Sequence, residues 1–316
     1  MKICLISFDN WGYDEKITHE LIKMEHEAFH IKLSDYKYNY KNTGERIINF
    51  LNKIIFQKNI KKIKTEEFIL SVLRNKGLQD KIIVINPERI SKNCHLRIKS
   101  YSSSYIAYLY DSIDRYDNKK LIIDNIFDKV FTFDKKDAHD YNLLFLSNYI
   151  HLNKKVAKNK PQHKVLSITS IDDRYPTINN IIGHLDHNKI SHETIFFGKR
   201  RPHKLKKSVT FTKEKLSQSQ IQEKAENSEI ILDVLRENQN GLSFRIFDAL
   251  ALDKKIITTN DSVIEYDFYN PNNIFVIDKN KIEIPKDFFN TEYQKIPNTI
   301  YEKYTLNSWI KNILKE

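Results

Sequence analysis

The sequence has little glycine and little cysteine. Its 316 residues contain six glycines, and no two of them are closer than fifteen positions. This spacing excludes both G-x-G-x-x-G and G-x-x-x-x-G-K-[ST], and with them a standard dinucleotide dehydrogenase and a P-loop NTPase. The two cysteines, Cys4 and Cys94, exclude a disulfide framework and a four-cysteine zinc site. A reducing compartment, the cytoplasm, is the expected location.

Long apolar runs are also missing. No stretch approaches the roughly 20 apolar residues that a membrane-spanning helix requires, so we expect no transmembrane segment. The first apolar run, residues 1–8, is short and is followed by Asp9 and Asn10. It therefore predicts a core strand and not a signal peptide.

The composition is that of a basic globular protein. Lys and Arg number 52 against 41 Asp and Glu, a formal charge of +11, and 40% of the residues are hydrophobic. Such a chain buries a large core, and its length predicts roughly two domains. Positive charge is concentrated in residues 58–64 and 199–207. Each segment is either a solvated face or a contact for phosphate-rich lipid or nucleic acid.

One amphipathic helix is predicted over residues 45–57. Ile47, Phe50, Leu51, Ile54 and Ile55 share one stripe. One interpretation is a helix that packs on the core and is followed by a solvated basic segment. The other is a helix that lies on an anionic membrane surface.

Short β-branched runs alternate with helical patterns along the whole chain, which predicts an α/β fold with parallel sheets. The predicted strands are 2–8, 81–86, 105–110, 129–133, 164–169, 192–197, 229–234, 255–259 and 273–277. Two sheets fit the length better than one, and the polar stretch 151–163 predicts a linker. We expect domains at 1–155 and 156–300, with a C-terminal helix in 301–316 that packs back on the N-terminal domain.

Residues 229–260 form the most informative segment, and they predict a strand, a loop, a helix and a strand. Gly241 provides a turn, Ser243 is a natural N-cap, and the amides of the following helix favour an anion. Arg245 opposes the helix dipole, which an anionic ligand would explain; Arg236 adds a second cation. The alternative is that Arg245 pairs with Asp233 or Asp248.

The run from Gly241 to Asn260 resembles the donor-binding segment of bacterial GT-B glycosyltransferases of capsule and lipopolysaccharide core synthesis, the CgeB-like group. Residues 108–112, 127–141 and 266–273 are similar to other motifs of that group. The resemblance implies two Rossmann-like domains with parallel sheets that face a central cleft. It also implies that the N-terminal domain binds the acceptor and the C-terminal domain the nucleotide-sugar.

The resemblance assigns donor-binding roles residue by residue. Asp248 matches a carboxylate that holds the ribose, while Asn240 stands where retaining members carry a second carboxylate. Arg245 would face the donor phosphates. Thr259 and Asn260 would line the same pocket, and Arg174 would contact the donor from the first turn of the second domain.

Transfer also requires a group that removes the proton of the acceptor hydroxyl. Asp111 follows the strand 105–110, and Asp9 follows the first strand. Ligands of open α/β sheets collect at such strand ends, so Asp111 is the first candidate base and Asp9 the second. The alternative role of an Asp at this position is a helix cap.

These observations predict a glycosyltransferase that moves a sugar from a nucleotide-sugar to a saccharide or lipid-linked acceptor. We expect no cofactor and no catalytic metal. Nucleic acid is not an expected partner; an anionic inner-membrane surface is. Two alternatives stay open: a sugar-nucleotide epimerase or hydrolase on the same fold, and a basic nucleic-acid-binding protein.

Overall fold

The computed structural model describes residues 1–9, 11–56, 58–115, 119–152 and 160–315. Contacts divide the chain into unit 1, Met1–Phe133 with Asp137–Phe145, and unit 2, Asp134–Lys136 with Leu146–Glu316. The division therefore precedes the boundary predicted after residue 155. Most of the predicted linker, residues 153–159, lies outside the described residues.

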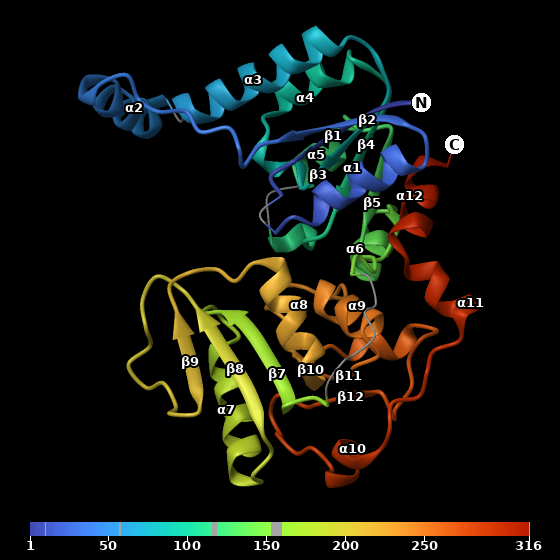
Figure 1. The fold of residues 1–316 in the computed structure, drawn as a ribbon. Helices are drawn as coiled ribbons and strands as arrows, with labels where there is room; N and C mark the ends of the chain where they lie inside the picture. The colour runs from blue at the N-terminus through green and yellow to red at the C-terminus, as the bar shows by residue number, and fades with distance from the viewer. Residues whose placement is uncertain (10, 57, 116–118, 153–159, 316) are drawn as a thin grey trace. The chain divides into compact units, whose positions relative to one another are not determined.

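Unit 1 contains one parallel sheet of six strands in the order β2-β1-β3-β4-β5-β6 (Figure 1). Its strands are β1 (Lys2–Ser7), β2 (Glu27–Lys32), β3 (Gln79–Ile85), β4 (Ser102–Leu109), β5 (Lys129–Thr132) and β6 (Leu144–Phe145). The central strands are apolar on both faces, and Leu5 lies opposite Ile83 across the β1–β3 pair. Burial on both faces is typical of parallel sheets.

Helices cover both faces of this sheet. Ile69 and Leu73 of one helix pack with the sheet residues Ile82 and Tyr105, while Ile17 is buried from another helix. The helices are α1 (Tyr13–Lys23), α2 (Thr43–Phe56), α3 (Ile60–Lys76), α4 (Lys92–Lys99), α5 (Lys119–Ile123) and α6 (Lys135–Asp140), with short turns at Pro87–Arg89 and Ile113–Arg115. α6 spans the division between the units.

The amphipathic helix α2 does not pack its apolar stripe on the core. Ile47, Phe50, Leu51, Ile54 and Ile55 are 48–64% exposed. Figure 1 shows α2 beyond the end of α3, away from the sheet of unit 1. The interpretation of a core-facing helix is therefore wrong. A periodic pattern shows that a helix has an apolar face, but not which surface that face meets.

Unit 2 contains a second parallel sheet of six strands in the order β12-β11-β10-β7-β8-β9. Its strands are β7 (His163–Ser170), β8 (His192–Phe197), β9 (Val209–Thr212), β10 (Ser228–Asp233), β11 (Lys255–Thr258) and β12 (Ile274–Val276). All nine predicted strands are confirmed. β2, β6 and β9 were not among them.

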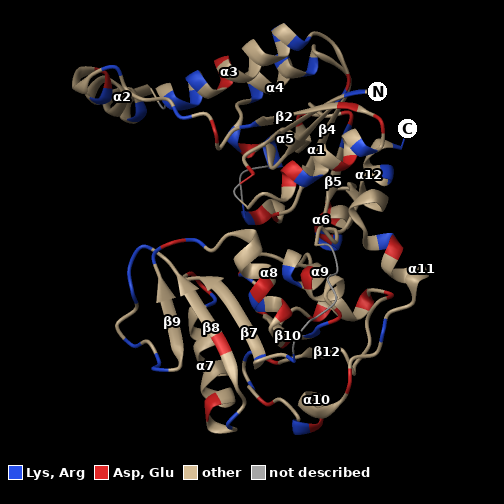
Figure 2. Cartoon of the chain, in the orientation of Figure 1, with Lys and Arg blue, Asp and Glu red and all other residues tan. Residues whose placement is uncertain are grey.

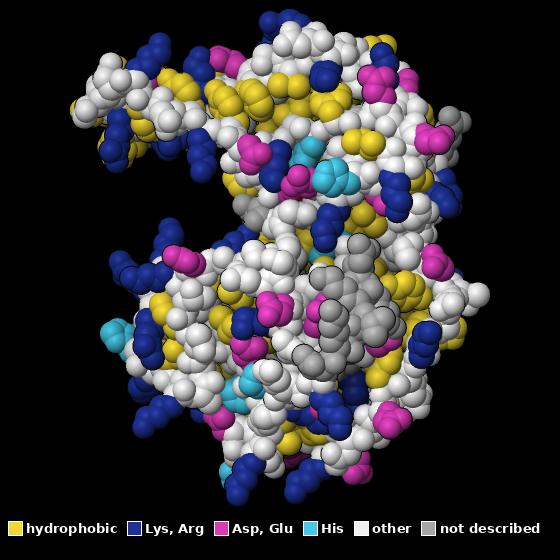
Figure 3. Space-filling view, viewed as in Figure 1, with side chains coloured by type: hydrophobic (Ala, Val, Ile, Leu, Met, Phe, Trp, Pro, Cys, Tyr) yellow, Lys and Arg dark blue, Asp and Glu magenta, His cyan; other side chains and the backbone are white. Residues whose placement is uncertain are grey.

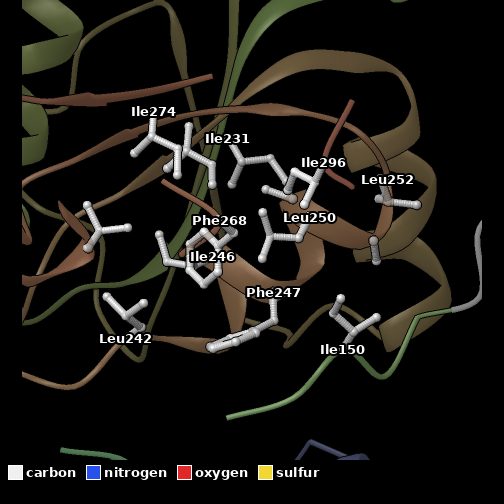
Figure 4. Packing of buried hydrophobic residues seen from close by; sticks show 14 of the residues in the cluster. Ile150, Ile231, Leu242, Ile246, Phe247, Leu250, Leu252, Phe268, Ile274 and Ile296 are labelled. Carbon is white, nitrogen blue, oxygen red and sulfur yellow. The ribbon is translucent and has the colours of Figure 1, made fainter. Parts of the chain in front are cut away.

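The core of unit 2 lies on both faces of this sheet. Ile181 of one helix packs with Val165 and Phe196. On the other face, Ile246 and Phe247 belong to a cluster with strand residues, shown in Figure 4. The helices are α7 (Tyr175–His187), α8 (Gln218–Glu226), α9 (Phe244–Ala251), α10 (Lys286–Asn290), α11 (Asn298–Tyr301) and α12 (Leu306–Leu314), with turns at Asp261–Glu265 and Glu302–Tyr304.

The C-terminal helix α12 groups with unit 2. Its buried Trp309 packs on Tyr149, with 5.0 Å between the ring centroids. That α12 also packs on the N-terminal domain stays a prediction. In the described part of the chain, no helix is both long enough and apolar enough to span a bilayer.

Candidate functional site

The strand order of unit 2 changes direction between β7 and β10. From β7 the chain proceeds to β8 and β9 on one side, and β10, β11 and β12 extend the sheet on the other. Ligands of open parallel sheets bind outside the carboxyl ends of the strands at such a switch point. The loop after β7 carries Arg174, and the loop after β10 carries Arg236. Both candidate arginines are therefore placed where a ligand is expected.

Arg174 forms the buried base of this site. Its side chain is 3% exposed. Nε donates to Oδ1 of Asp172 at 2.9 Å, and Nη2 donates to Oδ2 at 2.7 Å. Nη2 also donates to Oγ of Ser170 at 3.1 Å. A bidentate pair of this kind fixes both side chains and compensates a buried guanidinium.

Arg236 and Arg245 complete an arginine cluster with Arg174. Nη2 of Arg236 lies 3.1 Å from Oδ2 of Asp172, and Nη1 of Arg245 donates to Oδ1 of Asp233 at 2.9 Å. The side chains of Arg236 and Arg245 are each 29% exposed. The alternative that Arg245 pairs with Asp233 is thus confirmed, and both outer arginines retain access to solvent.

The electrostatics of the arginine cluster favour an added anion. Burial lowers the pKa of Arg174, and the charges of Arg245 and Arg236 lower it further. Burial alone would raise the pKa of Asp172, but the hydrogen bonds and charge of Arg174 hold it well below its usual range. In the ion pairs of the cluster three cations thus share two carboxylates, Asp172 and Asp233, while Asp173 accepts from the amide of Glu237 beside Arg236. A phosphate group at the two outer arginines would offset the excess positive charge.

The turn at Gly241 is held by side chains of the protein. Nδ2 of Asn260 donates to the carbonyl oxygens of Asn240 at 3.0 Å and Gly241 at 3.3 Å. The amide of Asn240 donates to Oδ2 of Asp134 at 3.3 Å, and Gly241 and Asn260 are buried. The Asn240 amide is therefore engaged by Asp134, and Asn260 holds the two carbonyl groups of the turn; the donor-binding roles of Asn240, Gly241 and Asn260 stay predictions.

Ser243 and Thr259 position the loops of the site. Ser243 caps α9 as predicted: its Oγ accepts from the amide of Arg245 at 3.2 Å and donates to Oδ1 of Asp233 at 2.7 Å. Oγ1 of Thr259 accepts from the amide of Leu235 at 2.9 Å. Both hydroxyls are engaged with the protein, so they hold the cluster in place.

Asp248 lies on α9 and is 7% exposed. Its Oδ1 is 3.3 Å from Nδ1 of the buried His151, whose ring meets Phe244 edge to face. The sequence analysis missed His151, because it falls in a stretch that was interpreted as a linker. The ribose-binding role of Asp248 stays a prediction, and a ribose would have to share this carboxylate with His151.

Unit 1 has its own switch point, between β1 and β3. Asp9 follows β1 and is 4% exposed. Its two carboxylate oxygens accept from the amides of Asp14 and Glu15 in the first turn of α1, each at 3.2 Å. The alternative role predicted for Asp9, a helix cap, is therefore the one observed, and a catalytic role for Asp9 stays a prediction.

Asp14 is a titratable group that the sequence analysis missed. It is fully buried in the first turn of α1. Burial and the neighbouring Asp9 carboxylate raise the pKa of Asp14 to about 7. A carboxyl group with this pKa exchanges a proton readily at neutral pH. The helical period of apolar residues in α1 was the one signal in the sequence that could have indicated the burial of Asp14.

Asp111, the first candidate base, lies after β4. Its Oδ2 accepts from Nδ2 of Asn86 at 3.1 Å, and its Oδ1 is 3.5 Å from Nε of Arg115. Burial raises the pKa of Tyr110, and the charges of Asp14, Asp111 and Asp9 raise it further. The charges of these residues and of Glu88 therefore act on one hydroxyl group in unit 1. The base role of Asp111 stays a prediction.

The described residues include no group of three or more His, Cys, Asp or Glu side chains arranged to hold a metal ion. Cys4 and Cys94 are buried free thiols. Partly exposed guanidinium groups thus lie at the strand ends of unit 2, and the carboxyl groups of Asp9 and Asp111 follow strand ends in unit 1.

Comparisons with known proteins find similarity in structure and not in sequence. No protein-family model matches the chain, and no curated protein matches it. The UDP-GlcNAc 2-epimerase of Methanocaldococcus jannaschii, solved with UDP-GlcNAc and UDP, is 15% identical, with a TM-score of 0.58 over 99% of both chains.

The UDP-GlcNAc 2-epimerase of Neisseria meningitidis, bound to UDP-GlcNAc, is 11% identical, with a TM-score of 0.54 over 100% of both chains. A glycosyltransferase from Streptomyces nogalater is 9% identical, with a TM-score of 0.48 over 99% of this chain and 94% of the other. The capsule and lipopolysaccharide group is not among these neighbours. At such identities the likeness concerns the fold alone. That fold is the GT-B fold, in which one chain contains two α/β units and each unit has a parallel sheet.

Proposed function

We propose that the arginine cluster of unit 2 binds the diphosphate of a nucleotide-sugar and that the protein transfers the sugar to an acceptor. The observation that carries the proposal is the convergence of Arg174, Arg236 and Arg245 at the switch point between β7 and β10. Arg236 and Arg245 would contact the phosphate oxygens. Arg174 would hold Asp172, and through it Arg236, in place.

Glycosyl transfer requires that the charge of the departing diphosphate be neutralised. Guanidinium groups fixed in advance by carboxylates supply this stabilisation without reorganisation when the bond breaks. The acceptor hydroxyl must also lose a proton, a step to which a positioned base contributes roughly 10²–10⁴-fold in rate. Asp111 and Asp9 of unit 1 are the candidates for that base.

The acceptor that fits the sequence best is a saccharide or lipid-linked saccharide of bacterial surface polysaccharide synthesis, in capsule or lipopolysaccharide core. The resemblance of residues 241–260 supports this proposal, and so does the formal charge of +11, because these acceptors and the inner membrane leaflet are anionic. The proposed location is the cytoplasm, at the inner face of the inner membrane.

A second candidate is acceptor-independent conversion of the nucleotide-sugar by epimerisation or hydrolysis. The neighbours with TM-scores above 0.5 named above are UDP-GlcNAc 2-epimerases. This function uses the same arginine cluster and requires no acceptor site.

Product analysis separates the two candidates. The protein is incubated with UDP-, GDP-, ADP-, dTDP- or CMP-sugars, with and without a lipopolysaccharide-core or capsular oligosaccharide. Nucleotide release that depends on the oligosaccharide supports transfer, and turnover in its absence supports epimerisation or hydrolysis. If no nucleotide-sugar binds or reacts while the protein is folded, both candidates are wrong.

A further inference from the structure

The helix α2 is attached to unit 1 by its polar face. Asn49 is its one buried residue, at 3% exposure. Its Oδ1 accepts from the amide of Ile60 at the start of α3 at 2.7 Å, and its Nδ2 donates to the hydroxyl of Tyr40 at 2.8 Å. An amphipathic helix of a globular domain normally does the opposite and buries its apolar stripe. The arrangement therefore directs the apolar face of α2 away from the protein.

That apolar face is broad and continuous. At 100° per residue, its side chains cover an arc of about 160°, and Asn49 lies opposite the centre of that arc. Every member of the face is at least 48% exposed. The face consists of Ile47, Ile48, Phe50, Leu51, Ile54 and Ile55. An exposed apolar surface of this extent marks an interaction site.

Positive charge surrounds the apolar face. Residues 41–64 contain seven Lys or Arg and a single carboxylate, Glu45, which already accepts from the Tyr38 hydroxyl at 2.7 Å. Arg46 and Lys53 of α2 and Lys58 beyond it are exposed. Figure 2 shows Lys and Arg along α2 and the start of α3, and Figure 3 shows hydrophobic and cationic side chains side by side there.

We propose that α2 binds the surface of an anionic phospholipid bilayer, with its apolar face at the boundary between headgroups and acyl chains and its lysines among the lipid phosphates. A polar attachment, a broad apolar face and flanking lysines are the features that an interfacial helix requires. The proposal concerns unit 1 and does not depend on the nucleotide-sugar site.

Charge argues against a second copy of this chain as the occupant. In a two-fold dimer the same patch meets itself. The seven cations of residues 41–64 in each copy would then face the seven of the other copy, with one carboxylate from each copy, Glu45, between them. Anionic lipid supplies the opposite charge, so the membrane is the occupant that the charge pattern favours.

Vesicle flotation tests the proposal with the full chain. We expect the protein to float with phosphatidylcholine vesicles that contain phosphatidylglycerol, to bind phosphatidylcholine alone weakly, and to dissociate as salt is raised. Ile54→Glu/Ile55→Glu should weaken binding at least about tenfold, because it places charge on the apolar face. Lys61→Gln/Lys62→Gln should weaken binding to the anionic vesicles only.

Two variants on α5 serve as matched controls. Ile123→Glu alters an isoleucine that is 61% exposed, close to the 64% of Ile54, and Lys119→Gln/Lys120→Gln alters an exposed lysine pair. Both should float like the wild type. Flotation of the Ile54→Glu/Ile55→Glu variant at the wild-type level would overturn the proposal. The proposal would also be overturned if the wild type were a dimer in solution and the Ile54→Glu/Ile55→Glu variant a monomer.

A fluorescent label provides a second readout. Cys4 and Cys94 are buried, so a cysteine introduced by Ile54→Cys can be labelled selectively with an environment-sensitive dye. We expect its emission to shift to the blue with anionic vesicles, while the same dye on an Ile123→Cys variant does not respond. Equal responses from the two labelled variants would overturn the proposal.

Discussion

Arg236 differs from Arg245 in the state of the paired carboxylate that would remain after its removal. Asp172 would keep its two hydrogen bonds from Arg174, whereas the loss of Arg245 would take the cation from Asp233, whose side chain is 2% exposed. A buried carboxylate without its cation is destabilising. Arg236 is therefore the residue at which ligand binding can be separated from folding.

We expect Arg236→Gln to weaken the binding of the nucleoside diphosphate about tenfold, since a hydrogen bond to a charged group is worth about 1.5–3 kcal/mol. The free energy of unfolding should change by less than about 0.5 kcal/mol. Calorimetric titration and urea unfolding measure the two quantities. Arg200→Gln, which alters an exposed arginine of the same unit, should change neither. Normal affinity in Arg236→Gln would remove this residue from the site.

Asp14 makes the stability of the protein depend on pH in a defined direction. Its pKa is about 7 in the folded protein against an ordinary value of 3.8. Between these values the native state holds a proton on Asp14 that the unfolded state releases. The contribution of Asp14 to the free energy of unfolding is therefore fully present below about pH 4 and is lost as the pH rises to about 7.

Asp14→Asn removes this dependence. Relative to the wild type, the variant should gain free energy of unfolding as the pH rises from about 4 to about 7, by at most about 4 kcal/mol, and the difference should then stay constant. Urea unfolding of both proteins at pH 5 and pH 8 measures it. A difference that is the same at the two pH values would show that Asp14 titrates normally.

The sequence predicted some of these residues and could not predict others. Arg174, Arg236 and Arg245 were predictable because each follows a strand end or begins a helix. His151 was not, since it falls in a stretch without periodicity, and the burial of Asp14 was indicated only by its helical spacing from Ile17 and Leu21. The hydrogen bonds of Asn260 to the Asn240 and Gly241 carbonyl groups could not be predicted, because they exist only in the folded loop; its role in donor binding stays a prediction.

At the scale of elements, the helices α9 and α8 both begin with a serine N-cap, but the two serine side chains form different further hydrogen bonds. Ser243 and Ser217 are N-caps with nearly identical backbone angles, φ −70° and −69°. Ser243 in addition donates to Asp233 at 2.7 Å. Its hydroxyl thus serves both the helix and the arginine cluster.

We expect Ser217→Ala to lower the free energy of unfolding by about 1 kcal/mol, the usual cost of a lost cap. Ser243→Ala should cost about 1 kcal/mol more, because the buried Asp233 also loses a hydrogen-bond donor. Urea unfolding measures both variants. An equal loss in the two would indicate that the bond to Asp233 contributes nothing.

The positions of the strands were predicted better than the surfaces that the helices contact. Runs such as Ile230–Leu232 are apolar on both faces and bounded by polar residues, so their local pattern suffices. β2 carries polar residues and β6 has only two residues, so neither has such a pattern. The helix α2 was predicted correctly, but the sequence left two orientations open, since a polar attachment through Asn49 leaves no mark on the period.

At the scale of the whole molecule, alternation of strands and helices was enough to predict two parallel sheets, because βαβ connections allow few other arrangements. The switch points that place the candidate sites were not predictable. They depend on the lateral order β2-β1-β3 and β10-β7-β8, which the order of elements along the chain does not determine. The choice between transfer and epimerisation depends on whether turnover requires an added oligosaccharide, which the product analysis measures.

A crystal structure of the protein with a nucleoside diphosphate, UDP first, tests the central claim most directly. We predict diphosphate oxygens within hydrogen-bond distance of the guanidinium groups of Arg236 and Arg245, beside the carboxyl ends of β7 and β10. A diphosphate bound elsewhere, with Arg236 and Arg245 still contacting only protein groups such as Asp172 and Asp233, would contradict it.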